Sequence, residues 1–146
     1  MTMQRVSMIT LGVSDLERAQ TFYADWGWEA HAAEGSIVFY QLNGLALALF
    51  PLAMLVEDQA RGGDAVGTGA MTLAQNFPVE ADVDKRFEAA LAAGATALKR
   101  PEKTEWGGYS GYISDPDGHV WELAVNPFWE LGEDGAVTMP RGSEPG

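Results

Sequence analysis

The segment WGGYSGYISDPDGHVWELAVNP, residues 106–127, decides the fold of this chain. At its centre, Asp115-Pro116-Asp117-Gly118 has proline at the second position and glycine at the fourth, a pattern typical of a tight turn. Strands are predicted on both sides of the turn, over residues 109–114 and 119–126. The segment is therefore predicted to form a β-hairpin.

Outward from this hairpin, the same order of elements is predicted twice. The first half has a strand over 6–13, a helix from 16 to about 26, and strands over 36–42 and 45–50. The second half has a strand over 70–77, a helix over 80–93, and strands over 96–99, 109–114 and 119–126. Residues 16–30 align with 83–97 without a gap, which places Gly27 over Gly94 as the glycine that ends each helix. An internal duplication is predicted.

The boundaries follow from these elements. A single domain over 1–146 is expected, with a first module over 5–56, a linker over 57–69, a second module over 70–127 and a C-terminal tail over 128–146. The tail is expected to fray beyond Met139. Ser14 and Glu17 have the spacing of a capping box, which predicts that Ser14 caps the first helix.

The composition excludes several classes of protein. The 146 residues are 47% hydrophobic and contain no cysteine, so a disulfide scaffold and a thiolate site are excluded. The net charge of −12 argues against nucleic acid and membrane partners, since both carry negative charge. It provides solubility, or it attracts a cationic ligand. The N-terminal residues lack the apolar run of a signal peptide, so a cytoplasmic location is expected.

Two stretches carry a resemblance to a known family. DPDGHVWEL, residues 115–123, resembles the last hairpin of the glyoxalase/bleomycin-resistance/extradiol-dioxygenase (vicinal oxygen chelate) superfamily, and TLGVSDLERAQTFYADWGWE, residues 10–29, resembles its first strand and helix. The resemblance implies an α+β fold in which two βαβββ modules form curled mixed sheets around a cavity. It also implies a homodimer, with the cavity lying either within one chain or across two.

The metal positions of that family are mostly lost in this chain. The resemblance implies four inward positions that hold metal ligands. Three of them correspond here to Met8, Thr72 and Glu122, and the fourth lies in the LALALF strand (residues 45–50), which has no candidate ligand. A thioether and a hydroxyl do not replace two imidazoles as ligands of a divalent cation. We therefore predict a metal-ligand-poor member with no metal in the usual place, and we expect no cofactor.

Strand alternation from Glu122 predicts which side chains line the cavity. The inward set is Met8, Thr10, Thr72, Asn76, Tyr112 and Glu122, and an aromatic lid of Trp106 and Tyr109 is predicted over it. Each member also has a purely structural interpretation, with Glu122 in an internal ion pair or hydrogen bond, Tyr112 a packed strand residue and Met8 a core filler. An aromatic cluster is expected in the core, made of Trp26, Trp28, Phe39 and Tyr40.

Two functions are consistent with these features. The first is a binding protein that takes a small organic ligand, cationic or aromatic, into a metal-poor cavity. The alternative is a lyase, isomerase or dioxygenase of the same superfamily that acts through Glu122 and Tyr112. A stress or repair accessory acting through protein contacts is a third and weaker hypothesis. Glyoxalase I activity is not expected, because that chemistry depends on a metal acting as a Lewis acid.

Overall fold

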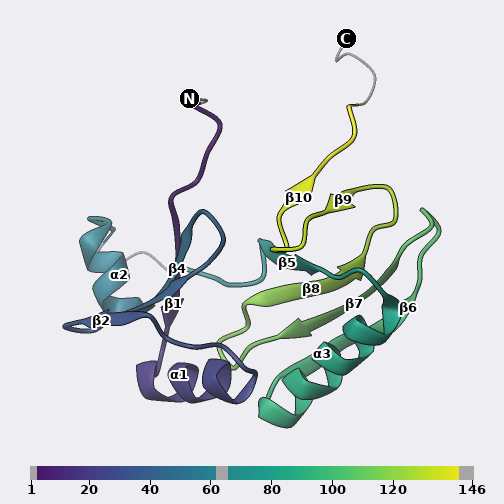
Figure 1. Ribbon diagram of the computed structural model, residues 1–146. Helices are drawn as coiled ribbons and strands as arrows, with labels where there is room; N and C mark the ends of the chain where they lie inside the picture. Colours follow the sequence, from purple (N-terminus) through teal and green to yellow (C-terminus); the bar gives the residue numbers. More distant parts are fainter. Residues whose placement is uncertain (1–2, 62–65, 142–146) are drawn as a thin grey trace.

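The computed structural model describes residues 3–61 and 66–141 and contains two four-stranded mixed sheets (Figure 1). The first sheet has the order β1-β4-β3-β2, formed by β1 (Met8–Val13), β2 (Ala32–Glu34), β3 (Ile37–Gln41) and β4 (Ala46–Pro51). The second has the order β5-β8-β7-β6, formed by β5 (Thr72–Asn76), β6 (Thr96–Lys103), β7 (Tyr109–Ser114) and β8 (Val120–Val125).

Both halves have the same topology. Helix α1 (Leu16–Asp25) follows β1, and helix α3 (Glu80–Ala93) follows β5. The first strand of each half runs parallel to the last, β1 beside β4 and β5 beside β8, and the remaining pairs are antiparallel. The predicted α+β fold with two βαβββ units is confirmed. The two helix-ending glycines also match, since Gly27 and Gly94 have φ angles of 105° and 115°.

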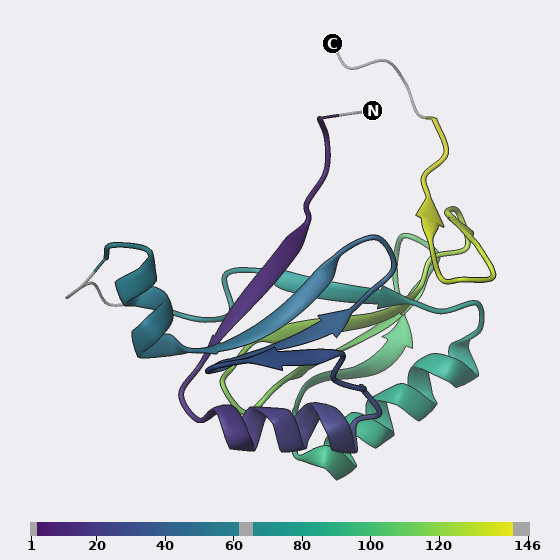
Figure 2. The same cartoon turned by 60° about the vertical axis from the view of Figure 1, so that its left-hand side comes forward.

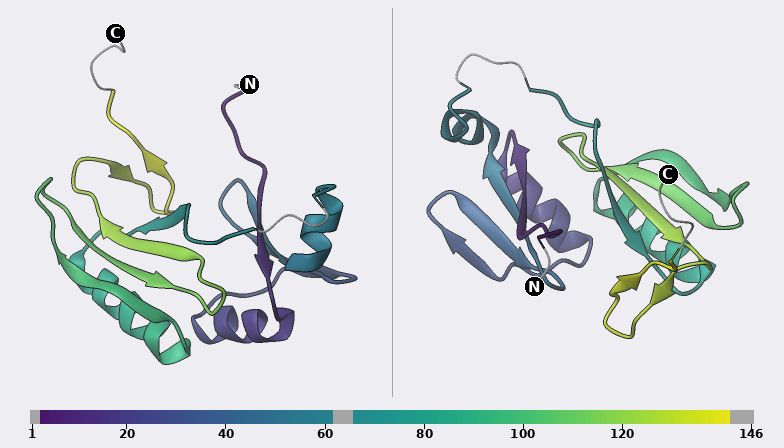
Figure 3. Two further views of the ribbon diagram at one scale, coloured as in Figure 1. Left: turned by 180° about the vertical axis from the view of Figure 1, so that it is seen from behind. Right: turned by 90° about the horizontal axis from the view of Figure 1, so that it is seen from above.

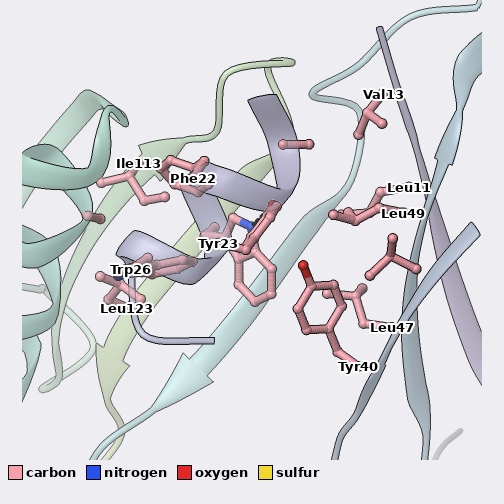
Figure 4. Close-up of a cluster of buried hydrophobic side chains, with 14 of the residues drawn as sticks. Leu11, Val13, Phe22, Tyr23, Trp26, Tyr40, Leu47, Leu49, Ile113 and Leu123 are labelled. Carbon is pink, nitrogen blue, oxygen red and sulfur yellow. Dashed lines mark hydrogen bonds between the residues drawn. The ribbon is translucent and has the colours of Figure 1, made fainter. Parts of the chain in front are cut away.

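One hydrophobic core joins the two halves. Helix α1 packs on the first sheet and lies beside α3, which covers the second sheet (Figure 2). Phe22 and Tyr23 on the buried face of α1, and Trp26 directly after the helix, are at most 2% exposed. Their cluster includes leucines of the first sheet, such as Leu47, and residues of the second, such as Leu123 (Figure 4). Helix α1 therefore supplies apolar surface to both sheets at once.

The predicted cap of α1 is wrong by one residue. The N-cap is Asp15, whose Oδ1 accepts a 3.1 Å hydrogen bond from the Arg18 N–H. Ser14 instead donates both its N–H and its hydroxyl to Oδ1 of Asp117, at 2.8 and 3.0 Å. Ser14 therefore binds Asp117 of the DPDG turn, which is distant in the sequence, and does not cap α1 as its local spacing predicts.

The segments between and around the predicted elements differ from expectation in four places. Helix α2 (Leu52–Asp58) crosses the predicted module boundary and packs on β1 and β4. No strand is predicted at the position of β2, and β6 extends four residues beyond its predicted end, with register shifts along it. The tail contains two short antiparallel strands, β9 (Glu130–Leu131) and β10 (Val137–Thr138). Parts of the predicted linker (62–65) and of the tail (142–146) lie outside the described residues.

Both sheets leave one face without a helix over most of its area. In the view from above, the two sheets stand beside each other, with α1 and α3 beneath them (Figure 3). No helix in the described residues has both the length and the apolar character needed to cross a membrane.

Candidate functional site

The open face of the second sheet carries the predicted catalytic pair. Ile113, Trp121 and Leu123 are buried on the helix-covered face, and the intervening residues point to the other side. Tyr112 and Glu122 are opposite each other in the β7–β8 register, and the Tyr112 hydroxyl donates a 3.1 Å hydrogen bond to Oε2 of Glu122. The structure therefore brings these two residues together on one half-buried patch.

The electrostatics of this pair favour a protonated phenol beside a carboxylate. Burial raises the pKa of Tyr112, and the charge of Glu122 and the hydrogen bond to it raise that pKa further. In the part of the chain that is described, no lysine, arginine or histidine lies within salt-bridge distance of Glu122. Among the described residues, Glu122 is consequently a carboxylate with one donor and no positive partner.

The remaining positions on this face surround the pair unevenly. Ala74 of β5, and not Thr72, is the register partner of Glu122; Thr72 pairs with Val120 and is exposed. Asn76 pairs with Ala124 and is half-buried. Thr72 and Asn76 therefore lie on β5 two residues before and two residues after Ala74, the residue that pairs with Glu122.

The predicted aromatic lid is split by the structure. The Tyr109 hydroxyl donates a 2.6 Å hydrogen bond to Oδ1 of Asp84 on α3, so Tyr109 points to the helix side of the sheet. Tyr109 lies three positions before Tyr112, and strand alternation places the two on opposite faces. The Trp106 ring folds over Gly108, where a Cβ would come within 2.1 Å of the ring. Tyr109 is thus not a lid residue, and Trp106 remains a half-exposed aromatic at the end of the hairpin.

The open face of the first sheet is mainly apolar. Met8 is 45% exposed at one end of β1. Phe39 pairs with Ala48 and alternates with Val38 and Tyr40, which point into the core. The prediction of Phe39 as a core residue is wrong for this reason, since a strand cannot bury consecutive side chains on one face.

Thr10 lies in a separate cavity of about 280 Å³ beneath α2. Its walls are mostly apolar and include Leu52, Leu55 and Val120. His119 is a polar group in this cavity, and its Nε2 lies 2.7 Å from the carbonyl oxygen of Gly12, which makes that nitrogen a donor. Sequence reasoning did not assign His119 to a site; its position directly before the cavity-lining Val120 was the available signal.

The donor set does not fit the metal that the superfamily implies. Among residues 3–61 and 66–141, no three histidine, aspartate or glutamate side chains gather in one place. The residues that pair with Glu122 on the neighbouring strands are Ala74 of β5 and Tyr112 of β7. Met8 pairs with Ala46 on β4. A single carboxylate with a phenol does not provide the three or four imidazole or carboxylate ligands that a divalent cation takes.

Comparison with known proteins identifies the family. A sequence model of the Glyoxalase/Bleomycin resistance protein/Dioxygenase superfamily matches residues 5–123. The protein belongs to this superfamily, as the DPDGHVWEL hairpin predicts.

Individual relatives support the same assignment. The crystal structure of a glyoxalase-related enzyme from Fulvimarina pelagi is 42% identical with a TM-score of 0.87, and the match covers 95% of this chain and 100% of that one. The metallothiol transferase FosB of Lysinibacillus sphaericus is 28% identical over 127 residues, which are 84% of this chain and 83% of FosB. An uncharacterized protein of Mycobacterium bovis is 43% identical over 53 residues, 36% of this chain, and the match spans 34% of that protein's length.

Proposed function

We propose that this protein binds a small organic ligand with a cationic or hydrogen-donating group at the Tyr112–Glu122 pair. The observation that carries the proposal is the half-buried Glu122 carboxylate, which accepts one hydrogen bond from Tyr112 and has no ion-pair partner in the described chain. A partly desolvated carboxylate gains most from a cation or from a donor that completes its hydrogen bonds. The net charge of −12 attracts cations to the whole molecule.

A second copy of the chain is the proposed cover for the open sheet faces. The first sheet offers an apolar face with Met8 and Phe39, and the second offers a polar face with Tyr112 and Glu122. Apolar sheet faces of this kind are stabilised when another surface removes them from water. A homodimer that places one face against the other would enclose a cavity with both an apolar and a polar wall. Sedimentation analysis tests this, and a strict monomer at micromolar concentration would contradict it.

The ligand proposal is tested with benzyltrimethylammonium as the cationic aromatic probe and benzyl alcohol as its neutral counterpart. We expect the cation to raise the melting temperature more than the alcohol does, because a ligand that binds the folded state stabilises it by mass action. Glu122→Gln keeps the shape and removes the charge, so it should abolish the difference. Glu88→Gln removes an exposed charge on α3 and should leave the difference intact. Equal effects of the cation on wild type and Glu122→Gln would contradict the proposal.

The alternative function is an isomerase, lyase or dioxygenase acting through the same two residues. It is favoured by one observation, a carboxylate held against a protonated phenol, which are a general base and a general acid within 3.1 Å of each other. The match to a protein described as a glyoxalase-related enzyme supports it. Turnover of a candidate substrate that disappears in Glu122→Gln and in Tyr112→Phe, with both variants folded, would establish catalysis over simple binding.

A further inference from the structure

A second hollow lies on the opposite side of the sheets from Tyr112 and Glu122. It is an open groove of about 780 Å³ between the two modules. Its walls come from the segment after α1, from the end of β3, from β5 and from α3, and include Trp28, Tyr40, Gln75 and Arg86. Gln75 alternates with Ala74, the register partner of Glu122, and therefore points away from the Glu122 face. The groove is thus independent of the site proposed above.

Arg86 is held in this groove without an anionic partner in the described part of the chain. Its Nη2 donates a 2.7 Å hydrogen bond to the carbonyl oxygen of Trp26, and its guanidinium carbon lies 5.2 Å from the centre of the Trp26 ring. Burial lowers its pKa. The described ion pairs of the chain are Arg18–Asp117, Lys99–Glu102, Arg100–Glu88 and Lys103–Glu80. In a chain with 21 acidic and 9 basic residues, an oriented, partly buried guanidinium that pairs with none of the described carboxylates is suited to an anion from outside.

The backbone around the guanidinium leaves its second nitrogen uncovered. A Cβ at position 27 would lie 3.3 Å from Nη1 of Arg86, but this position is Gly27, which has a positive φ of 105°. The residue that ends α1 thus also leaves space beside Nη1. A carboxylate is the planar anion that a guanidinium binds through two parallel hydrogen bonds.

Gln75 provides a second, independent indication of a ligand. Its Oε1 is shielded from solvent and has no hydrogen-bond partner among residues 3–61 and 66–141. An unpaired buried carbonyl oxygen costs about 1–3 kcal/mol, so such atoms are normally satisfied by a donor. Trp28 and Tyr40 add aromatic walls, and the exposed Glu29 also lines the groove.

We propose that this groove binds a small aromatic monocarboxylate that also carries a hydroxyl group. The carboxylate pairs with the guanidinium of Arg86, the Gln75 amide group turns so that its Oε1 faces the groove and accepts from the hydroxyl, and the ring packs against the aromatic walls. The two protein groups differ in role, because Arg86 supplies affinity for the anion and Gln75 distinguishes hydroxylated from plain rings.

The experiment uses 3-hydroxybenzoate and benzoate as probes of the whole 146-residue chain. Binding is measured by isothermal titration calorimetry and by the NMR shifts of the tryptophan indole groups. We expect wild type to bind 3-hydroxybenzoate about tenfold more tightly than benzoate, the value of one hydrogen bond. Arg86→Gln should weaken both probes at least about tenfold, and Gln75→Leu should remove only the difference between them.

Matched controls separate this groove from other sites. Lys85→Gln makes the same change of charge one residue earlier on α3 and should leave both affinities unchanged. Glu122→Gln should also leave both affinities unchanged. A negative result at this groove is therefore distinguishable from a negative result for the function proposed at Tyr112 and Glu122. If Arg86→Gln does not fold, Arg86→Lys keeps the charge without the planar fork and should weaken both probes. No saturable binding of either probe up to about 10 mM, or equal binding by Arg86→Gln, would overturn the proposal, as would a preference that survives in Gln75→Leu.

Discussion

The hydroxyl of Tyr23 on α1 donates a 2.6 Å hydrogen bond to Oδ2 of Asp115, the first residue of the DPDG turn. Asp115 is 4% exposed, and its Oδ1 accepts from the backbone N–H groups of Asp117 and His119. The indole N–H of Trp121 donates to the Tyr23 hydroxyl at 3.1 Å. A buried carboxylate is thus satisfied by neutral donors, and it ties the turn of the second module to the helix of the first.

Replacement of Tyr23 by phenylalanine should be strongly destabilising. It leaves Oδ2 of Asp115 and the Trp121 indole N–H without their partner, so we expect a loss of about 2–4 kcal/mol in the free energy of unfolding. Urea denaturation followed by tryptophan fluorescence measures it. Tyr109→Phe is the matched control, since it removes an exposed tyrosine–carboxylate hydrogen bond and should cost much less. Equal costs would contradict the role assigned to the buried pair.

Stability should fall with rising pH in the alkaline range. The hydrogen bond to Asp84 raises the pKa of Tyr109 to about 12, and burial followed by the charge of Asp115 raises the pKa of Tyr23 further. An unfolded tyrosine loses its proton near pH 10, so between about pH 10 and 12 the unfolded state binds fewer protons than the folded state. Unfolding therefore becomes more favourable as the pH rises through this window.

Denaturation at a series of pH values, with tyrosinate absorbance as a second signal, checks this window. Tyr109→Phe should make the slope between about pH 10 and 12 shallower, because one tyrosine with a raised pKa is removed. A stability that is flat or rising over the same range would show that these phenols are not held in their neutral form.

Asp117 should matter more than the arginine with which it pairs. Its Oδ1 accepts from the N–H and hydroxyl of Ser14 as well as from Arg18, and its side chain is 7% exposed. We expect Asp117→Ala to cost about 1–2 kcal/mol and Arg18→Ala about 0–1 kcal/mol, since an exposed ion pair contributes little. A double-mutant cycle on thermal or urea unfolding measures the coupling. An Arg18→Ala cost larger than that of Asp117→Ala would show that the ion pair, and not Ser14, is the main contact.

Gly111 on β7 should tolerate no side chain. A Cβ there would lie 2.9 Å from the backbone nitrogen of Pro101 and 3.0 Å from the carbonyl oxygen of Lys99, where β6 is irregular. Because backbone atoms cannot move aside cheaply, Gly111→Ala should cost about 1–3 kcal/mol. Gly67→Ala, at a position with no atom of the described residues within 4 Å and no positive φ, should change stability by less than about 1 kcal/mol. A neutral Gly111→Ala would indicate that β6 is free to shift.

Much of the fold could be predicted because its signals are local. Turn residues, strand alternation and helix-ending glycines predict α3 and β7 at their observed bounds. The facing of Tyr112 and Glu122 followed from alternation across one tight turn. The predictions failed where a distant partner outweighs the local pattern, as for Ser14, which binds Asp117, and Tyr109, which binds Asp84.

The sequence by itself determined the family, the two repeated modules and the presence of a lone carboxylate on the last strand, since each is encoded within a short run of residues. Only the tertiary structure decided which distant residues contact these features. The carboxylates of the DPDG turn receive donors from residues 92 and 103 positions away, and Arg86 and Gln75 are brought to one groove by the packing of α3 beside β5 and α1. No local pattern specifies such pairs, because the free energy that forms them comes from burying two modules in a single core.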